Sequence, residues 1–278
     1  RYSLRSAPEP PKWQAMKTGK DRLYTSKILK SGALLAETKV LLANWNDSLT
    51  VDENLERFKQ ENILGKASRS RLIDILVIFK QRYLIDDQVI GALTFLAKKR
   101  HPAYEFDRIL FFHAARADPL MHDFVSERLK SMYEAGIREV RLKDAELWIR
   151  KKIDEERTRS PWSEHTIIKS GQGLLSSLRD YWIFQGIKNK HFAPINLPVK
   201  AFSYIAFCLN REQPSGMRLV EDPEWRLFFL NPQDVERLFM EAHQLHLLSY
   251  QAAGSVIRIS FPSETIEEYA HVILERTP

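Results

Sequence analysis

The chain has 278 residues, of which 44% are apolar and 28% charged, a balance that excludes bulk disorder and favours one large or two medium globular domains. Its longest apolar stretches, 72–79 and 201–209, are far shorter than the roughly 18 to 20 residues that span a bilayer, so we expect a soluble protein with no membrane partner. A formal net charge of +6 attracts polyanions, which makes nucleic acid the leading candidate partner.

The first half of the chain has the spacing of amphipathic helices. Apolar residues recur every three or four positions within 24–45, and again along 72–96. Thr50 and Glu53 are spaced as a capping box at the start of another helix, which we expect to run to about residue 63. Asp118 can cap a helix that has Pro119 as its first residue. Short linkers between these helices predict an antiparallel helical cluster.

The second half combines helices with strand signals. We expect one helix near 144–157 and a longer one after Ser163. Residues 254–262 form the clearest strand candidate, and 226–230 and 185–195 are weaker ones. The sequence therefore predicts a mainly α protein with two helical domains. The composition changes sharply near residue 160, which places the domains at 1–160 and 161–278, the second with a short β-strand or wing element.

The segment ENILGKASRSR (61–71) has a glycine, a lysine and two serines near the positions that a phosphate-binding loop requires. Such a loop needs a glycine five residues before its Gly-Lys pair and Ser or Thr directly after that pair. Gln60 and Ala67 occupy those positions, and the preceding residues are predicted to be helical rather than a strand. This spacing excludes a nucleotide-binding loop.

Two metal-site patterns are equally weak. Asp21, Glu37 and Lys39 follow the order of a metal-dependent nuclease, but the last two lie in a predicted helix and not on the β-hairpin that such a site needs. His243 and His246 have a spacing that can place two imidazoles on one zinc ion, yet no cysteine lies nearby and no third ligand is evident. We therefore expect no metal site.

Other catalytic chemistry is also unsupported. The single cysteine, Cys208, lies in an apolar run, which predicts an inert core residue and excludes an intramolecular disulfide framework. There is no nucleophile elbow and no glycine-rich dinucleotide fingerprint. The sequence predicts a cytoplasmic protein that is not an enzyme and holds no cofactor.

The segment 61–71 is better explained as a junction between two helices. Gly65 can end the first helix, and Ser68 can cap the second. Lys66, Arg69 and Arg71 remain unexplained, because positive charges at the first turn of a helix oppose its macrodipole unless they share an anion. These cations and Ser68 are candidate contacts for a DNA backbone, against the alternative of a solvated helix face.

Residues 144–197 follow the order helix, turn, helix and basic hairpin, which is typical of a winged helix-turn-helix. In such a module the N-terminal half of the second helix enters the major groove of double-stranded DNA. Ordinary helix packing is the alternative. The candidate DNA-binding residues are Arg159, Ser163, His165, Thr166, Lys169 and Gln172 on the turn and second helix, with Lys188, Lys190 and His191 on the wing.

Residues 31–84, together with WSEHTIIKSGQGLLSSLRDYWIF (162–184), resemble the BrxA family, the small helical component of bacterial BREX phage-defence systems. The block around 61–71 is the most specific part of the resemblance. It implies a cytoplasmic, mostly α-helical, two-domain protein that binds DNA without catalysis. It also implies action with other BREX proteins, including a methyltransferase that marks host DNA. Members have been labelled inner-membrane proteins, a label that this sequence does not fit because it lacks an adequate apolar span.

The function expected from these features is non-enzymatic binding of duplex DNA in BREX defence, chiefly through phosphate contacts. The main alternative is an assembly module for other BREX proteins, with exposed aromatic residues such as Trp13 and Trp225 as contacts. RNA is a further alternative ligand, since the family is similar in architecture to a helical RNA-binding antitermination factor. An enzyme that uses Glu37 or His243 is the most remote alternative.

Overall fold

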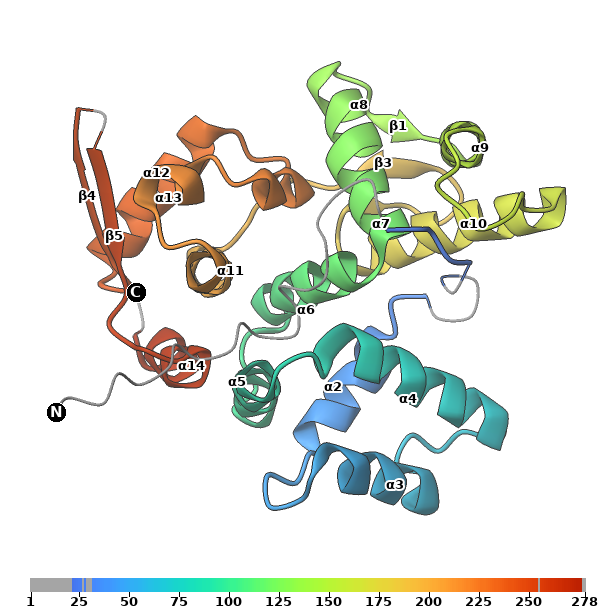
Figure 1. Ribbon diagram of the computed structural model, residues 1–278, viewed down its shortest axis with the longest axis horizontal. Helices are drawn as coiled ribbons and strands as arrows, with labels where there is room; N and C mark the ends of the chain where they lie inside the picture. Colours follow the sequence, from blue (N-terminus) through green and yellow to red (C-terminus); the bar gives the residue numbers. More distant parts are fainter. Residues whose placement is uncertain (1–21, 27, 29–31, 255, 277–278) are drawn as a thin grey trace, which may run out of the picture.

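The computed structural model describes residues 22–26, 28, 32–254 and 256–276, and these are mainly helical (Figure 1). The first helices are α2 (Leu35–Ala43), α3 (Val51–Glu61), α4 (Arg69–Tyr83), α5 (Asp87–Lys98) and α6 (Ala103–Ala117). The middle of the chain forms α7 (Pro119–Asp123), the π-helical segment η1 (Phe124–Leu129), α8 (Lys130–Glu134), β1 (Glu139–Val140), α9 (Leu142–Asp154), α10 (Glu164–Asp180), β2 (Phe184–Gln185) and β3 (Lys190–Phe192). The last elements are α11 (Val199–Glu212), α12 (Gly216–Val220), the 3₁₀ segment η2 (Pro223–Phe228), α13 (Pro232–Gln244), β4 (Ser249–Ala253), β5 (Val256–Ser260) and α14 (Ile266–Glu275).

Several of these helices begin at the capping residues that the sequence predicted. The Thr50 hydroxyl accepts from the Glu53 N–H, and the Glu53 carboxylate accepts from the Thr50 N–H, which completes the capping box of α3. Asp118 accepts from two N–H groups in the first turn of α7, with Pro119 at the first helical position. Ser163 caps α10 in the same way. Each cap supplies a partner for backbone donors that the helix itself leaves unpaired.

Helix α6 lies at the centre of the molecule (Figure 1) and is buried around almost its whole circumference. Its Phe111 ring lies 5.3 Å from the Tyr181 ring and 5.6 Å from the Phe228 ring, measured between centroids. These contacts join three distant parts of the chain in one apolar core. Residues on both sides of position 160 contribute to this core. The division into two domains there stays a prediction.

The first predicted helix is shorter than its apolar pattern. Gly32 (φ 56°) and Leu34 (φ 54°) adopt left-handed conformations, so α2 begins only at Leu35. Tyr24 instead forms an isolated parallel bridge with Thr158. The apolar periodicity holds where the helix does form, since Leu41 and its neighbours Thr38 and Leu42 are buried.

The strand predictions had mixed outcomes. The candidate at 254–262 is confirmed as β5, which pairs with β4 in an antiparallel hairpin whose first strand was not predicted. The candidate at 185–195 is confirmed as the β2–β3 hairpin. The candidate at 226–230 is wrong, because residues 223–228 form the 3₁₀ segment η2, which Asp222 caps ahead of Pro223. Burial of this apolar run against the core, and not strand pairing, accounts for its composition.

A small antiparallel sheet has the strand order β1-β3-β2. In β3, His191 lies opposite Glu139 of β1 on one side and Gln185 of β2 on the other. The chain therefore runs through α7–α8, β1, α9, α10, β2 and β3, with helices α9 and α10 packed together beside the sheet (Figure 1). The predicted order of helix, turn, helix and hairpin is present, with the additional strand β1.

The last third of the chain repeats the order of helices followed by a hairpin. Helices α11 to α13 precede β4–β5, and α12 packs against β5 (Figure 1). A Cβ on Gly216 would lie 2.2 Å from the carbonyl oxygen of Ile257, so only glycine permits this approach. Among the described residues, no helix combines the length and apolarity needed to cross a lipid bilayer.

A histidine in α7 joins two carboxylates inside the molecule. The Nδ1 of His122 lies 3.0 Å from Asp123 Oδ1, and its Nε2 lies 3.3 Å from Glu224 Oε1. Burial lowers the pKa of His122, but the hydrogen bonds with Asp123 and Glu224 outweigh it and raise this pKa from 6.5 to about 9. The charged imidazolium therefore stabilises the junction between α7 and η2.

This raised pKa predicts a loss of stability at alkaline pH. Because the folded-state pKa of His122 exceeds the unfolded value, its contribution is complete below pH 6.5 and is lost as the pH rises through about 9. We expect the free energy of unfolding to fall by up to about 3 kcal/mol across that window. Urea unfolding at both ends of the window measures the fall. A His122→Gln variant should lose most of this dependence, and an equal slope in the variant would contradict the assignment.

Candidate nucleic-acid interface

Helix α10 presents one polar stripe to solvent. His165, Lys169 and Gln172 are exposed and follow one another at spacings of four and three. Ser176 and Arg179 continue the same line and are half-buried. With 17 residues, the helix is about 25 Å long, and the stripe extends along most of it.

The opposite face of α10 is fixed against the protein. Ile167, Leu174 and Leu178 on this face are buried. A Cβ on Gly171 would lie 3.0 Å from Cδ1 of Leu142, so the missing side chain lets α9 approach closely. Close packing of this kind makes α10 a rigid support for the exposed stripe.

Several cations near α10 have no competing carboxylate. Arg159, Lys169 and Lys188 form no ion pair or hydrogen bond with any residue that the structure describes, and all three are exposed. The carboxylate of Glu164, the acidic residue nearest the start of the stripe, is engaged by the guanidinium of Arg150. The surface around α10 therefore carries positive charge that is available to an external anion.

The hairpin after α10 ends in a tight turn. Gly186 has a φ of 90°, and a Cβ at this position would lie 2.1 Å from the carbonyl oxygen of Asn189. The Lys190 ammonium donates a hydrogen bond to the carbonyl of Ile187 at the tip. Burial, and next the charge of Arg179, lower the pKa of Lys190. Lys190 thus holds the wing together and is engaged inside the protein.

The other predicted wing residues differ in their surroundings. Lys188 is exposed at the tip, whereas His191 lies in the sheet opposite Glu139. A hydrogen bond from Arg141, and also the charge of His191, lower the pKa of the Glu139 carboxyl. An ionised carboxylate beside His191 makes this position less favourable to phosphate than Lys188.

In the segment 61–71, the predicted helix start is confirmed and the predicted helix end is wrong. The Ser68 hydroxyl accepts from the Arg71 N–H and caps α4. Gly65 does adopt the predicted left-handed conformation (φ 59°), but α3 has already ended, with the left-handed Asn62 (φ 46°) as its last-turn cap. The Asn62 side chain also accepts from the N–H of Lys66 and donates to its carbonyl. These bonds stabilise the left-handed conformation that ends the helix, a position where glycine was expected.

The cations of this segment are partly neutralised by an acidic residue far away in the sequence. Lys66 Nζ lies 2.9 Å from Glu37 Oε1 in α2. Burial raises the pKa of Glu37, but the hydrogen bond from Lys66 and the nearby charge of Arg71 outweigh it and lower this pKa. Arg69 is exposed and forms no ion pair with a described residue. Among the described cations of this segment, Arg69 has the charge most available to an outside anion, although the pKa of the nearby Glu56 carboxyl is lowered by Lys59 and Gln60 and then by Arg69.

The two predicted basic regions lie in different parts of the molecule. Figure 1 shows α3 and α4 in its lower part, whereas α9, α10 and the three-stranded sheet occupy the upper right. Arg159 precedes α10 and the wing residues follow it, so these predicted residues belong to one part of the fold, apart from those of the segment 61–71. Ser163 and Thr166 are engaged with each other at the start of α10, with 2.9 Å between their hydroxyl oxygens. Which of these residues contact DNA stays a prediction.

Some residues of this surface were not predicted. Ser176 and Arg179 extend the α10 stripe, and their spacing in the sequence could have identified them. Arg138 is exposed beside β1, and its carbonyl accepts from the Phe192 N–H at 3.1 Å. Ile187 at the wing tip had no signal as a surface residue, because an apolar residue beside a strand is ordinarily expected in the core.

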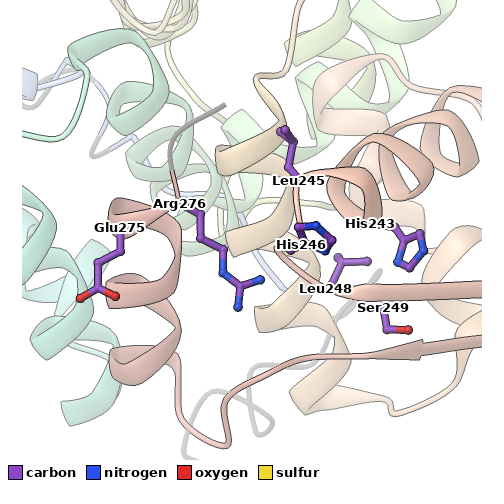
Figure 2. Close-up of a pocket in the computed structure, with 7 residues that line it drawn as sticks. All are labelled: His243, Leu245, His246, Leu248, Ser249, Glu275 and Arg276. Carbon is purple, nitrogen blue, oxygen red and sulfur yellow. The ribbon is translucent and has the colours of Figure 1, made fainter.

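The pair His243 and His246 lines an open hollow of about 830 Å³ between α13, β4 and α14 (Figure 2). In Figure 2, Arg276 reaches toward His246, while Glu275 points away from the hollow. The Nδ1 of His243 accepts from the Tyr250 N–H at 3.4 Å. No group of three potential metal-ligating side chains comes together within the described ranges.

Other expectations concern residues outside this surface. Glu37 and Lys39 of the nuclease pattern are bound in separate pairs, with Lys66 and Asp107 respectively. Burial raises the pKa of the Cys208 thiol to about 12, which confirms a buried thiol that is poorly ionised. Trp225 is only 2% exposed, which confirms the interpretation of this residue as core and excludes the alternative of an exposed contact for a partner. Asp21 and Trp13 lie outside the described residues.

Comparison with known proteins identifies the family. Residues 22–207 match the model of the BrxA family, which bears out the resemblance seen in the sequence. No curated protein matches significantly. Among solved structures, an uncharacterized protein from Magnetospirillum magneticum is similar, with a TM-score of 0.56, 14% identity, and coverage of 74% of this chain and 97% of that one. At this identity the likeness concerns the fold alone. The chain belongs to the BrxA family, whose members take part in BREX-type phage defence.

Proposed function

We propose that this chain is a non-enzymatic accessory protein of BREX defence that binds duplex DNA through α10 and the β2–β3 wing. The observation that carries the proposal is the exposed stripe of His165, Lys169 and Gln172 on a rigidly packed helix, followed by a hairpin whose tip carries a cation with no ion pair to a described residue. The order β1, α9, α10, β2, β3 and the strand order β1-β3-β2 support a winged helix-turn-helix. The loop between α9 and α10, residues 155–163, is longer than the usual turn of this motif.

The proposed contacts divide into two kinds. His165, Lys169 and Gln172 lie on the N-terminal half of α10, which would enter the major groove. Arg159 precedes α10 and Lys188 follows it on the wing, and both would contact phosphates beside the groove. Since most of these groups are cations without a rigid bidentate geometry toward a base, we expect weak sequence preference and a steep dependence on salt.

The charge of the exposed face favours α10 over α13 as the helix that meets DNA. The outward side chains of α13 include Glu236, Arg237 and Glu241, and Arg237 lies within 3.8 Å of Asp234. Carboxylates on this face would repel phosphates. The hairpin β4–β5 after α13 contributes only Arg258 as a cation among its described residues. The second set of helices and hairpin therefore lacks the electrostatic character that supports the proposal for α10.

The segment 61–71 is kept as a second, smaller phosphate contact. Arg69 lies in the first turn of α4 with an exposed side chain, where backbone N–H groups and a cation can share one phosphate. The ion pair between Lys66 and Glu37 reduces what Lys66 can add. An Arg69→Ala substitution should weaken binding by less than the loss of Lys169.

A duplex-binding titration with charge-removing variants tests the proposal. We expect the triple variant Arg159→Gln, Lys169→Gln, Lys188→Gln to bind roughly 100-fold more weakly at about 0.1 M salt, because three interface cations and the counterions that they release from the duplex are lost. The slope of log affinity against log salt should become shallower by about 3. Fluorescence anisotropy over a series of salt concentrations measures both quantities, and the fall should be similar for duplexes of unrelated sequence.

The matched control removes the same charge elsewhere. Lys99, Arg218 and Arg258 are exposed and form no ion pair with a described residue, and none lies on α10 or the wing. Their triple change to Gln should leave affinity within about twofold. If both triple variants weaken binding equally, the loss of affinity depends only on the net charge of the protein. That result would contradict the proposed binding surface. Undetectable duplex binding at low salt would instead favour an assembly module, and preference for an RNA duplex would favour RNA as the ligand.

A further inference from the structure

The tip of the β2–β3 wing carries an apolar side chain in full contact with solvent. Ile187 is 84% exposed, the largest exposed fraction among the large apolar side chains that the structure describes. A single exposed apolar residue is ordinary on a protein surface, so exposure alone assigns no role. Two further features of the wing distinguish this residue.

The first feature is that the tip is held in one conformation. Gly186 fits a turn in which no Cβ has room, and the buried Lys190 donates to the carbonyl of Ile187 itself. Behind the tip, the rings of Phe184 and Phe192 pack with centroids 5.5 Å apart. The hairpin thus presents Ile187 from a preorganised base, which reduces the entropy lost on inserting it into a partner.

The second feature is the charge around the tip. Lys188, the next residue, is exposed and has no ion pair with a described residue. Arg179 is close enough to Lys190 to lower the pKa of that lysine, although it also pairs with Asp180 at 2.7 Å. Exposed Arg138 lies at the base of the hairpin, level with Phe192, and Glu139 opposite His191 lies between it and the tip, so Lys188 and Arg179 are the cations of the tip itself. An apolar point among cations suits an anionic surface with an apolar interior, as base-paired DNA has, better than it suits an apolar protein surface.

The dimensions agree with a groove next to the one that α10 would occupy. Ten residues separate Lys169 from Arg179, which is about 15 Å along the helix axis. Half a turn of B-form DNA, from one groove to the next, is about 17 Å. If α10 tilts toward the duplex axis with Lys169 in a major groove, the wing beside Arg179 is within reach of the adjacent minor groove.

We propose that Ile187 is an apolar wedge that enters the minor groove beside α10 and partly unstacks one base step, so that this protein bends the duplex that it binds. The inference rests on the proposed function, since it requires α10 to hold DNA. Apolar wedges of this kind kink a duplex by about 20° to 90°, toward the major groove. Flexible pyrimidine–purine steps should then be preferred, because they unstack at the lowest cost.

The test uses the full-length protein and a duplex of about 20 base pairs with a donor and an acceptor dye at its ends and 2-aminopurine at a central TA step. Saturating protein should raise both energy transfer and 2-aminopurine fluorescence. Ile187→Ala should bind about tenfold more weakly and, at saturation, lose most of both signals. Ile187→Met should keep them. Lys188→Gln is the matched control, which should weaken binding but retain both signals at saturation.

The outcomes separate this inference from the proposed function. A wild-type protein that saturates the duplex without bending or unstacking it overturns the wedge and leaves DNA binding by α10 in place. Energy transfer and 2-aminopurine fluorescence that are unchanged in Ile187→Ala would likewise overturn the wedge and leave DNA binding by α10 in place. No binding to any duplex overturns both proposals together. A change in the oligomeric state of Ile187→Ala without DNA, with bending unaffected, would assign the tip to a protein contact instead. Because Ile187 is exposed, thermal melting of the variant should match the wild type.

Discussion

Replacing Trp225 by alanine should lower the free energy of unfolding by about 3 to 5 kcal/mol. The indole is 2% exposed and stacks on Phe202 with ring centroids 4.7 Å apart. Its Nε1 also donates to the carbonyl of Leu219 at 2.7 Å. The substitution leaves a cavity between α11 and η2 and removes the partner of a buried carbonyl, and both effects destabilise the fold. Equilibrium unfolding in urea measures the change.

Trp182 provides the matched control for Trp225. It is 50% exposed, with an edge contact to Tyr104 and one hydrogen bond to Asp107. Trp182→Ala should therefore cost less, about 1 to 2 kcal/mol, most of it from the lost hydrogen bond to the buried Asp107 carboxylate. Similar losses at the two positions would contradict the assignment of Trp225 to the core.

Replacing Arg116 by methionine should cost about 3 kcal/mol, the second large effect. The guanidinium makes two contacts with the Glu212 carboxylate, at 2.5 and 2.9 Å, and lies 3.8 Å from Glu224. It also lies over the Phe112 ring, 5.2 Å from the centroid. Methionine fills much of the space, but it leaves two carboxylates near each other without their shared cation. Removing one partner of a buried pair is more harmful than removing both.

The Arg116 prediction includes a pH signature. Burial already raises the pKa of Glu212, and the loss of Arg116 should raise it further, since Arg116 is the group that opposes this shift. A carboxyl whose folded-state pKa is raised loses stability as the pH increases through that range, so the variant should be weaker at pH 8 than at pH 5 relative to wild type.

Two further variants check the Arg116 interpretation. Adding Glu212→Gln to Arg116→Met should recover about half of the loss, which a double-mutant cycle measures. The exposed pair between Lys80 and Asp52, 2.9 Å apart, is the control, and Lys80→Met should cost less than about 0.5 kcal/mol. A loss without pH dependence and without recovery in the double variant would locate the effect in side-chain packing.

The helices were largely predictable because their signals are local. Thr50, Ser68, Asp118 and Ser163 all cap helices where the sequence placed them. Each needs only a hydrogen bond to a backbone group within three residues. The strand β1 was missed because two residues cannot show a period, and its pairing partner His191 lies far along the chain. The segment η2 was wrongly predicted as a strand, because a short buried run of apolar residues has the same sequence pattern in a strand and in a short helix.

The sequence predicted most of the residues that lie on the candidate interface, but not which of their charges are exposed to solvent. The spacing of His165, Lys169 and Gln172 follows directly from a helix that begins at Ser163. The sequence could not show that Lys190 is buried in the wing. It also could not show that the wing leaves Ile187 in solvent, because the exposure of one residue depends on everything packed around it.

By itself, the sequence determined the family, the helical periods, the caps and the position of the basic hairpin, since these depend on neighbours within one or two helical turns. Only the tertiary structure decided which charges remain free. Lys66 meets Glu37 across 29 positions of the chain, and Arg116 meets Glu212 across 96. Such pairs form when packing brings distant elements within a few ångströms, where Coulomb attraction exceeds solvent screening. Arg159, Lys169 and Lys188 kept their charge available because folding placed no described carboxylate within ion-pair distance of them.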